Sequence, residues 1–129
     1  MIELFIDGAS AGNPGKSGAG IFIKNAQHTK KHAIPLRAMN NHEAEYEALI
    51  HGLKLCLPFK DQIISCKTDS IAVFGAVEKR FIKNKQYARY LDEMIPLLDQ
   101  FDLFFIKWIP SKENKVADAL ARQAIHKGL

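Results

Sequence analysis

The segment Ile2-Glu3-Leu4-Phe5-Ile6-Asp7 begins the chain with the alternating side-chain pattern of a β-strand, and Gly8 ends that pattern. The residues that follow are rich in glycine, and the run Gly12-Asn13-Pro14-Gly15 is typical of a loop. We expect the same loop to include Gly18 and Gly20. The first strand is therefore predicted to end on a carboxylate, Asp7, where the chain leaves the sheet.

Two further strands are predicted before the first helix. Residues 21–23 and 32–36 are β-rich, and the polar stretch 25–31 between them favours an antiparallel reversal. From Asn41 onward, apolar side chains recur with helical spacing until Pro58 ends the pattern. An antiparallel three-stranded opening followed by an amphipathic helix is therefore expected.

The second half of the chain is predicted to add strands in parallel. Residues 62–68 form a β-rich run between two helical segments and are followed directly by Asp69. The fold class is therefore α/β, with a mixed five-stranded sheet flanked by helices. The remaining expected elements are a weak helix at 70–78, a basic turn at 79–86, a helix at 87–100 that Pro96 kinks or restarts, a buried strand at 102–109 and an alanine-rich helix at 114–127.

Composition sets limits on the class of protein. The chain has 129 residues, of which 47% are hydrophobic and 25% charged, which fits a single globular domain spanning residues 1–129. Its two cysteines, Cys56 and Cys66, lie in apolar runs and indicate a reducing, cytoplasmic location rather than disulfides. No apolar run approaches the ~20 residues of a membrane span, so we expect no membrane association. A net charge of +4 is compatible with a nucleic-acid partner but does not demonstrate one.

Glu45 is the most informative single residue. It shares the apolar stripe of the first predicted helix, whereas Glu43 and Glu47 fall on the solvated face. An unpaired buried carboxylate is costly, so Glu45 needs a partner. A salt bridge, a raised pKa and a bound metal each meet that need, and the residue alone does not decide among them.

Three other carboxylates have ordinary explanations when each is taken alone. Asp7-Gly8 is a common turn dipeptide, and Asp69-Ser70 is a suitable start for the helix that follows. Asp118 lies near the start of the last helix, where the helix dipole favours a negative charge. Individually, none of the three requires a functional role.

The predicted topology changes that assessment. If the strand at 62–68 is added beside the first strand through the intervening helix, Asp7 and Asp69 end next to each other at one edge of the sheet. Carboxylates that converge repel one another unless cations neutralise them, and oxygen ligands without nearby His or Cys suit Mg²⁺ or Mn²⁺. Two such ions, both present with substrate bound, would serve phosphodiester hydrolysis.

Four segments of the chain, in order, resemble the type 1 class of ribonuclease H. They match the patterns D-G-[AS]-x-x-G-N-P-G, N-x-x-A-E-Y-x-A-L, T-D-S and N-x-x-A-D-x-L-A. The corresponding residues are Asp7-Gly8-Ala9-Ser10-Ala11-Gly12-Asn13-Pro14-Gly15, Asn41-His42-Glu43-Ala44-Glu45-Tyr46-Glu47-Ala48-Leu49, Thr68-Asp69-Ser70 and Asn114-Lys115-Val116-Ala117-Asp118-Ala119-Leu120-Ala121.

The resemblance implies a function as well as a fold. It implies a ribonuclease H-like fold that holds divalent metal through Asp7, Glu45, Asp69 and Asp118, which would also be the catalytic residues. It further implies that the RNA strand of an RNA/DNA hybrid is cut. Such proteins recognise a hybrid by its shape and by its 2′-hydroxyls, which distinguish RNA from DNA. The residues expected to contact that hybrid are Gly8, Ser10, Asn13, Asn41, His42, Ser70 and Asn114.

The chain departs from the family pattern around the expected metal site. Many relatives have a histidine before the last helix, in an H-V-P-x-x-x-N pattern, where this chain has Trp108-Ile109-Pro110. Asn40 stands where a threonine is usual, His42 where a second asparagine is usual, and Ile71 where a glutamine is common. The absent histidine predicts attenuated turnover, and we expect the protein to be a monomer. The alternative function is a protein that binds hybrid or other nucleic acid with little or no catalysis. A third hypothesis is a nuclease of the wider superfamily that prefers a different duplex, such as structured DNA. A buried place in the core, closing the last strand, is the competing explanation for Trp108.

Overall fold

A computed structural model describes residues 1–128, and Leu129 lies outside the described residues. Two short 3₁₀ turns, Leu57–Phe59 and Ser111–Glu113, accompany the regular elements. The strands are β1 (Ile2–Ser10), β2 (Gly15–Lys24), β3 (Thr29–Met39), β4 (Ile63–Thr68) and β5 (Leu103–Trp108), and the helices are α1 (Asn41–Cys56), α2 (Ile71–Lys79), α3 (Arg89–Leu98) and α4 (Lys115–Lys127).

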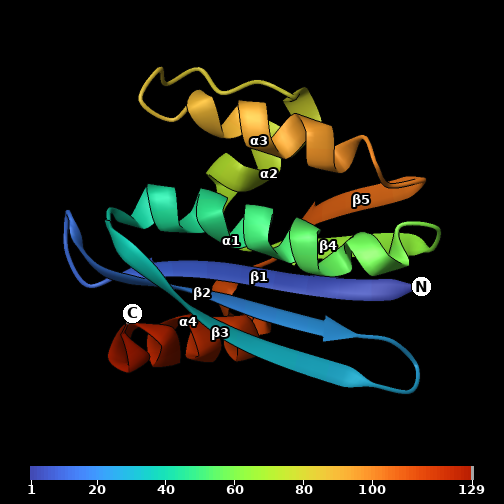
Figure 1. Ribbon diagram of the computed structural model, residues 1–129, viewed down its shortest axis with the longest axis horizontal. Helices are drawn as coiled ribbons and strands as arrows, with labels where there is room; N and C mark the ends of the chain where they lie inside the picture. The colour runs from blue at the N-terminus through green and yellow to red at the C-terminus, as the bar shows by residue number, and fades with distance from the viewer. Residues whose placement is uncertain (129) are drawn as a thin grey trace.

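The five strands form one mixed sheet in the order β3-β2-β1-β4-β5. The β1–β2 and β2–β3 pairs are antiparallel, whereas β4 joins β1 and β5 joins β4 in parallel. Helices α1, α2 and α3 lie on one side of the sheet and α4 on the other (Figure 1). This topology confirms the predicted fold class.

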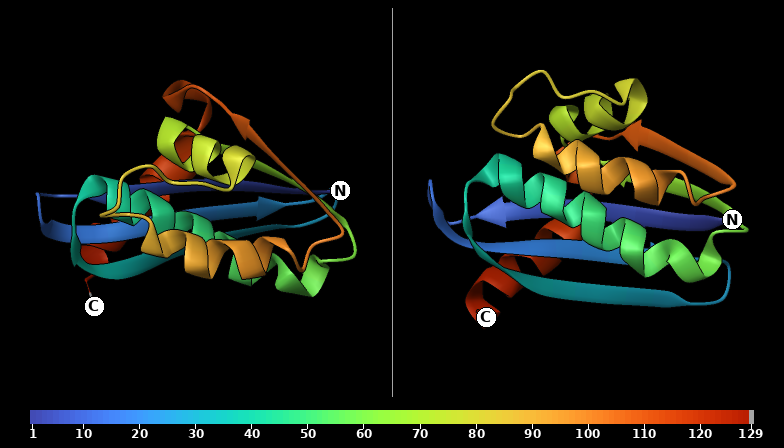
Figure 2. Two further views of the ribbon diagram at one scale, coloured as in Figure 1. Left: turned by 90° about the horizontal axis from the view of Figure 1, so that it is seen from above. Right: turned by 45° about the horizontal axis from the view of Figure 1, so that its top comes forward.

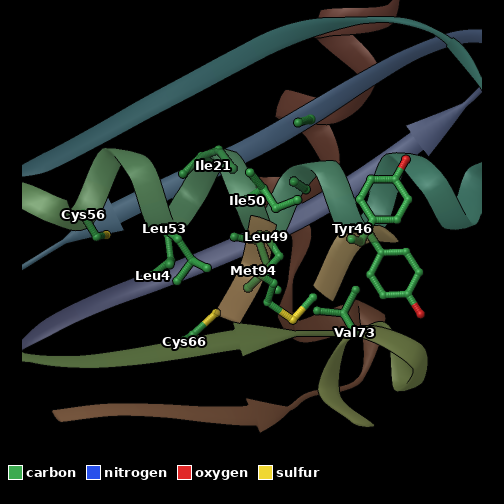
Figure 3. Close-up of a cluster of buried hydrophobic side chains, with 14 of the residues drawn as sticks. Leu4, Ile21, Tyr46, Leu49, Ile50, Leu53, Cys56, Cys66, Val73 and Met94 are labelled. Atoms are coloured by element: carbon green, nitrogen blue, oxygen red, sulfur yellow. The ribbon is translucent and has the colours of Figure 1, made fainter. Parts of the chain in front are cut away.

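The main hydrophobic core lies between the sheet and α1. Alternate residues of β1, Ile2, Leu4 and Ile6, are buried on the face that α1 covers, as the alternating pattern predicts. Figure 3 shows Leu49 and Leu53 of α1 beside Leu4 of β1, with Met94 of α3 and Val73 of α2 in the same cluster. The cysteines Cys56 and Cys66 are free and buried in this core.

The antiparallel strands are longer than the sequence predicts. Strand β1 does not end at Asp7 but continues to Ser10, because its pairing with β2 extends to Ser17. Strand β2 begins at Gly15 and includes Gly18 and Gly20, which the sequence predicts in a loop. The reason is tertiary: a Cβ on Gly20 would overlap the carbonyl oxygen of Ala117, and one on Gly18 that of Ala121. Both glycines therefore allow α4 to lie directly on the strand.

Strand β5 is not the buried strand that its apolar sequence predicts. It is an edge strand, and Leu103 and Phe105 are 50% and 57% exposed. Helix α4 crosses β1, β2 and β3 and leaves the outer side of β4 and β5 uncovered (Figure 2). The helix expected at 87–100 is shorter at both ends: α3 spans Arg89–Leu98, and it does not restart at Pro96.

Within residues 1–128, none of the helices combines the length and the apolar composition that crossing a bilayer requires.

We predict that Gly20→Ala lowers the free energy of unfolding by about 3 kcal/mol, because the added methyl group forces α4 away from β2. Urea denaturation measures the change. Gly75→Ala is the matched control, since a Cβ at this position in α2 meets no atom within 4 Å and alanine favours helix. A Gly20→Ala protein as stable as the Gly75→Ala protein would contradict the close packing of α4.

Candidate active site

Asp7 and Asp69 come together because of the parallel pairing of β1 with β4. The last registered pair of these strands is Ile6 with Thr68, so the next residue on each strand is an aspartate. Asp7 still belongs to β1, whereas Asp69 begins the turn into α2. The structure thus places both carboxylates at one end of the sheet.

Glu45 reaches the same place from α1. One carboxylate oxygen each from Asp7, Glu45 and Asp69 lie within 4.8 Å of one another, a spacing that could hold a metal ion. The close approach of α1 depends on Gly8, since a Cβ there would overlap the carbonyl of Ala44, the residue before Glu45. The apolar stripe of α1 therefore points Glu45 at the end of β1.

Asp118 approaches from α4, on the opposite side of the sheet. Its Oδ1 accepts a hydrogen bond from Arg122 Nε at 3.2 Å, and its charge contributes to the raised pKa of Asp7. Asp118 lines the same cavity as the other three carboxylates but is not part of the three-oxygen group. The four predicted metal-holding residues are thus together, with Asp118 at the wall of the site.

The carboxylates raise one another's pKa values. Burial raises the pKa of Asp7 to about 8, with further increases caused by the charges of Asp69 and Asp118. Burial likewise raises the pKa of Glu45 to about 7, the charge of Asp69 adds to this effect, and a hydrogen bond with Ser70 opposes it. Without a cation, protons are therefore held in this cluster near neutral pH.

A cavity of about 600 Å³ opens above the carboxylates. Of the residues expected to contact a hybrid, Gly8, Ser10 and Asn41 line it. The Ser10 hydroxyl is already committed to the backbone, with Oγ 2.6 Å from the carbonyl oxygen of Met39. Asn13 is exposed in the β1–β2 loop, outside the cavity lining.

The other expected contact residues have different surroundings. His42 is exposed at the start of α1, with Nδ1 3.7 Å from Glu45 Oε1. Ser70 is buried and caps α2 by accepting a hydrogen bond from Val73 N. Asn114 is only 1% exposed and donates from Nδ2 to the Ile6 carbonyl oxygen at 2.9 Å, so it ties α4 to β1. Burial contradicts a direct substrate contact for the Asn114 side chain.

Three polar residues of the cavity wall were not predicted from the sequence: Ser111, Arg122 and His126. Arg122 stands four residues after Asp118, a spacing at which helical side chains pair, so its bond to Asp118 was detectable. No feature of the sequence indicated that Ser111 and His126 line the cavity.

Trp108 lies beside the site at the end of β5. Its Nε1 donates a hydrogen bond to the backbone oxygen of Asp69 at 3.1 Å, and the side chain is 42% exposed. The explanation of Trp108 as a buried core residue is therefore wrong, because the side chain remains exposed on an edge strand of the sheet.

Known proteins resemble the chain over almost its entire length. EbsB of Enterococcus faecalis is 40% identical over 129 residues, an alignment that covers 98% of this chain and 96% of that protein. The crystal structure of RNase H1 from the halophilic archaeon Halobacterium salinarum matches with a TM-score of 0.89 at 28% identity and covers 98% of both chains. LC11-RNase H1, whose crystal structure contains an RNA/DNA hybrid, matches with a TM-score of 0.89 at 24% identity over 98% of both chains.

A family profile gives the same assignment. The profile of the reverse transcriptase-like family matches residues 5–124, a range that includes Asp7, Glu45, Asp69 and Asp118. Together with the strand order and the converging carboxylates, this match shows that the chain is a ribonuclease H1-like protein and belongs to the reverse transcriptase-like family.

Proposed function

We propose that this protein is a metal-dependent endonuclease that hydrolyses the RNA strand of RNA/DNA hybrids. The observation that carries the proposal is the convergence of Asp7, Glu45 and Asp69 within ligand distance at the floor of an open cavity. Similarity to ribonucleases H of known structure supports the reaction class. The hybrid bound to LC11-RNase H1 supports the choice of substrate.

The residues present fit a divalent metal. The site is built from carboxylate oxygens, which favour Mg²⁺ or Mn²⁺, and the raised pKa values of Asp7 and Glu45 reflect a surplus of negative charge. We propose that Asp7, Glu45, Asp69 and Asp118 hold two ions when substrate is bound. When bound, these ions supply Lewis-acid activation of water and stabilise charge on the leaving oxygen.

The chain's own residues have distinct tasks in this proposal. Asp7 is fixed in a strand and Glu45 in a helix, so both carboxylates are presented from rigid elements. Arg122 holds the Asp118 carboxylate from the open side of the cavity. Gly8, Ser10, Asn13, Asn41 and His42 would contact the hybrid along the rim, and Ser70 would act indirectly through Glu45.

Other expectations complete the proposal. The described residues would act as one domain and as a monomer in the cytoplasm, with a nucleic-acid hybrid as the partner. Turnover would be attenuated, because Trp108 cannot take up and release a proton as a histidine does.

A second function is favoured by the same residue. Together with Asn40, His42 and Ile71, Trp108 replaces groups that the family pattern uses around the metal site. A protein that binds hybrid with little or no cleavage would retain the cavity and the carboxylates. Direct measurement of cleavage distinguishes these two functions.

We predict that the protein cleaves a labelled RNA/DNA hybrid in Mg²⁺ or Mn²⁺ and that Asp69→Asn lowers the rate by at least about 10³-fold, because a metal-holding carboxylate is lost. Double-stranded RNA and DNA are the substrate controls. Asp61→Asn, an exposed aspartate in the turn before β4, is the matched control and should cleave normally. Hybrid binding without cleavage by the unmodified protein would establish the second function instead.

We predict that stability in EDTA falls as pH rises from about 4 to 8. The folded-state pKa values of Asp7 and Glu45, about 8 and about 7, exceed the ordinary values of 3.8 and 4.5, so the native state binds more protons in this window. The stabilisation that these bound protons give is complete at a pH below the ordinary pKa values. It is lost as the pH rises through the raised pKa values of the folded state. Urea denaturation should show that the free energy of unfolding falls by more than about 1 kcal/mol. Adding Mg²⁺ at pH 8 should restore the lost stability.

Asp69→Asn isolates the contribution of the cluster to this pH dependence. Removing the Asp69 charge lowers the pKa values of Asp7 and Glu45, so the variant should lose less stability between pH 4 and 8. The lowered pKa of half-buried His51 acts in the opposite direction in both proteins and cancels from the comparison. An equal pH dependence in the two proteins would contradict the assigned cause.

A further inference from the structure

The turn that carries Asp69 is held on both sides by hydrogen bonds. The carbonyl oxygen of Thr68 accepts from Ile109 N at 2.8 Å, and Ser70 N donates to Thr68 Oγ1 at 3.0 Å. Ser70 in turn caps α2. The residues before and after Asp69 are therefore fixed to β5 and to α2.

The Asp69 peptide itself has a different support. Its carbonyl oxygen accepts a hydrogen bond from the indole Nε1 of Trp108 at 3.1 Å. Trp108 is the register partner of Thr68 in the parallel β4–β5 pair, so the indole lies next to the end of β4. Strands β4 and β5 run side by side toward this end of the sheet in both views of Figure 2.

The hydrogen bond from Trp108 acts at the place where the carboxylates repel one another. The Asp69 carboxylate lies within 4.8 Å of the Asp7 and Glu45 oxygens, a distance at which like charges repel strongly in a partly buried site. Asp7 is fixed by the β-ladder and Glu45 by a helix, whereas Asp69 belongs to a turn. Repulsion is therefore expected to displace Asp69 more readily than its neighbours.

We propose that Trp108 is a positioning residue for the metal site: its indole N–H holds the Asp69 peptide so that the carboxylate stays turned toward Asp7 and Glu45. This inference rests on the proposed metal-dependent function. Burial of the ring does not explain the residue, because Trp108 is 42% exposed. The essential group is the N–H donor rather than the aromatic surface.

Trp108→Phe tests the proposal, because it keeps an aromatic ring and removes the donor. Calorimetric titration with Mn²⁺ alone should give a dissociation constant about three- to tenfold higher than that of the unmodified protein, as expected for one lost hydrogen bond. Phe105→Leu is the control, since Phe105 is an exposed aromatic residue on the same strand. Its Mn²⁺ affinity should be unchanged.

A kinetic measurement separates positioning from a general loss of structure. The metal concentration that gives half-maximal hybrid cleavage should rise by the same factor in Trp108→Phe, while the rate at saturating metal and the KM for hybrid stay near their original values. Trp108→Leu, which also lacks the donor, should behave in the same way. Thermal melts in EDTA check that each variant is folded at the assay temperature.

The outcomes are distinguishable from failure of the proposed function. Weaker Mn²⁺ binding by both Trp108 variants supports the positioning role, even if no hybrid is cleaved. Unchanged Mn²⁺ affinity in folded Trp108→Phe overturns it while leaving nuclease activity intact. Absence of Mn²⁺ binding by the unmodified protein up to millimolar concentrations would overturn both.

Discussion

Two helices approach the end of β1 from opposite sides, and the site depends on how closely they do so. Gly8 follows Asp7 and admits the backbone of α1 at Ala44, the residue before Glu45. Gly20 pairs with Asp7 across the β1–β2 ladder and admits the backbone of α4 at Ala117, the residue before Asp118. A side chain at either glycine would move a carboxylate-bearing helix outward, so backbone contact at these two positions sets the dimensions of the site.

The cost of this arrangement is electrostatic. Burial raises the pKa of both Asp7 and Glu45, and Asp69 increases both shifts through its charge. The fold tolerates the repulsion because the surrounding elements are well connected, through the Asn114 bond to Ile6 and through the hydrogen bonds about Asp69. Repulsion among the carboxylates lowers the stability of the protein when no cation is bound. A divalent cation removes this repulsion, so its binding stabilises the folded protein.

The fold and the carboxylates were predictable from the sequence because local pattern and topology agree there. Glu45 shares an apolar stripe, and Asp7 and Asp69 follow the last registered pair of the parallel β1–β4 ladder, so periodicity and sheet order predict that these three meet. The place of Asp118 followed only from the family resemblance. The extent of β2 and the exposure of β5 were not predictable, because both depend on where α4 crosses the sheet. The motif likewise gave Asn114 a surface role, whereas its side chain is buried between α4 and β1. Residues whose roles depend on a distant partner carry little signal in a single sequence.

The exposed edge strand β5 affects how the protein behaves in concentrated solution. An open sheet edge offers unpaired backbone groups to another molecule, and proteins limit this hazard with charge, proline or short length. The β3 edge has Pro35, which has no N–H to donate, together with Lys30 and Lys31. The β5 edge has only Lys107 among apolar neighbours, but it is six residues long. Brevity, rather than sequence, therefore protects this side of the molecule from strand-to-strand aggregation, and a mutation that lengthens β5 would reduce colloidal solubility.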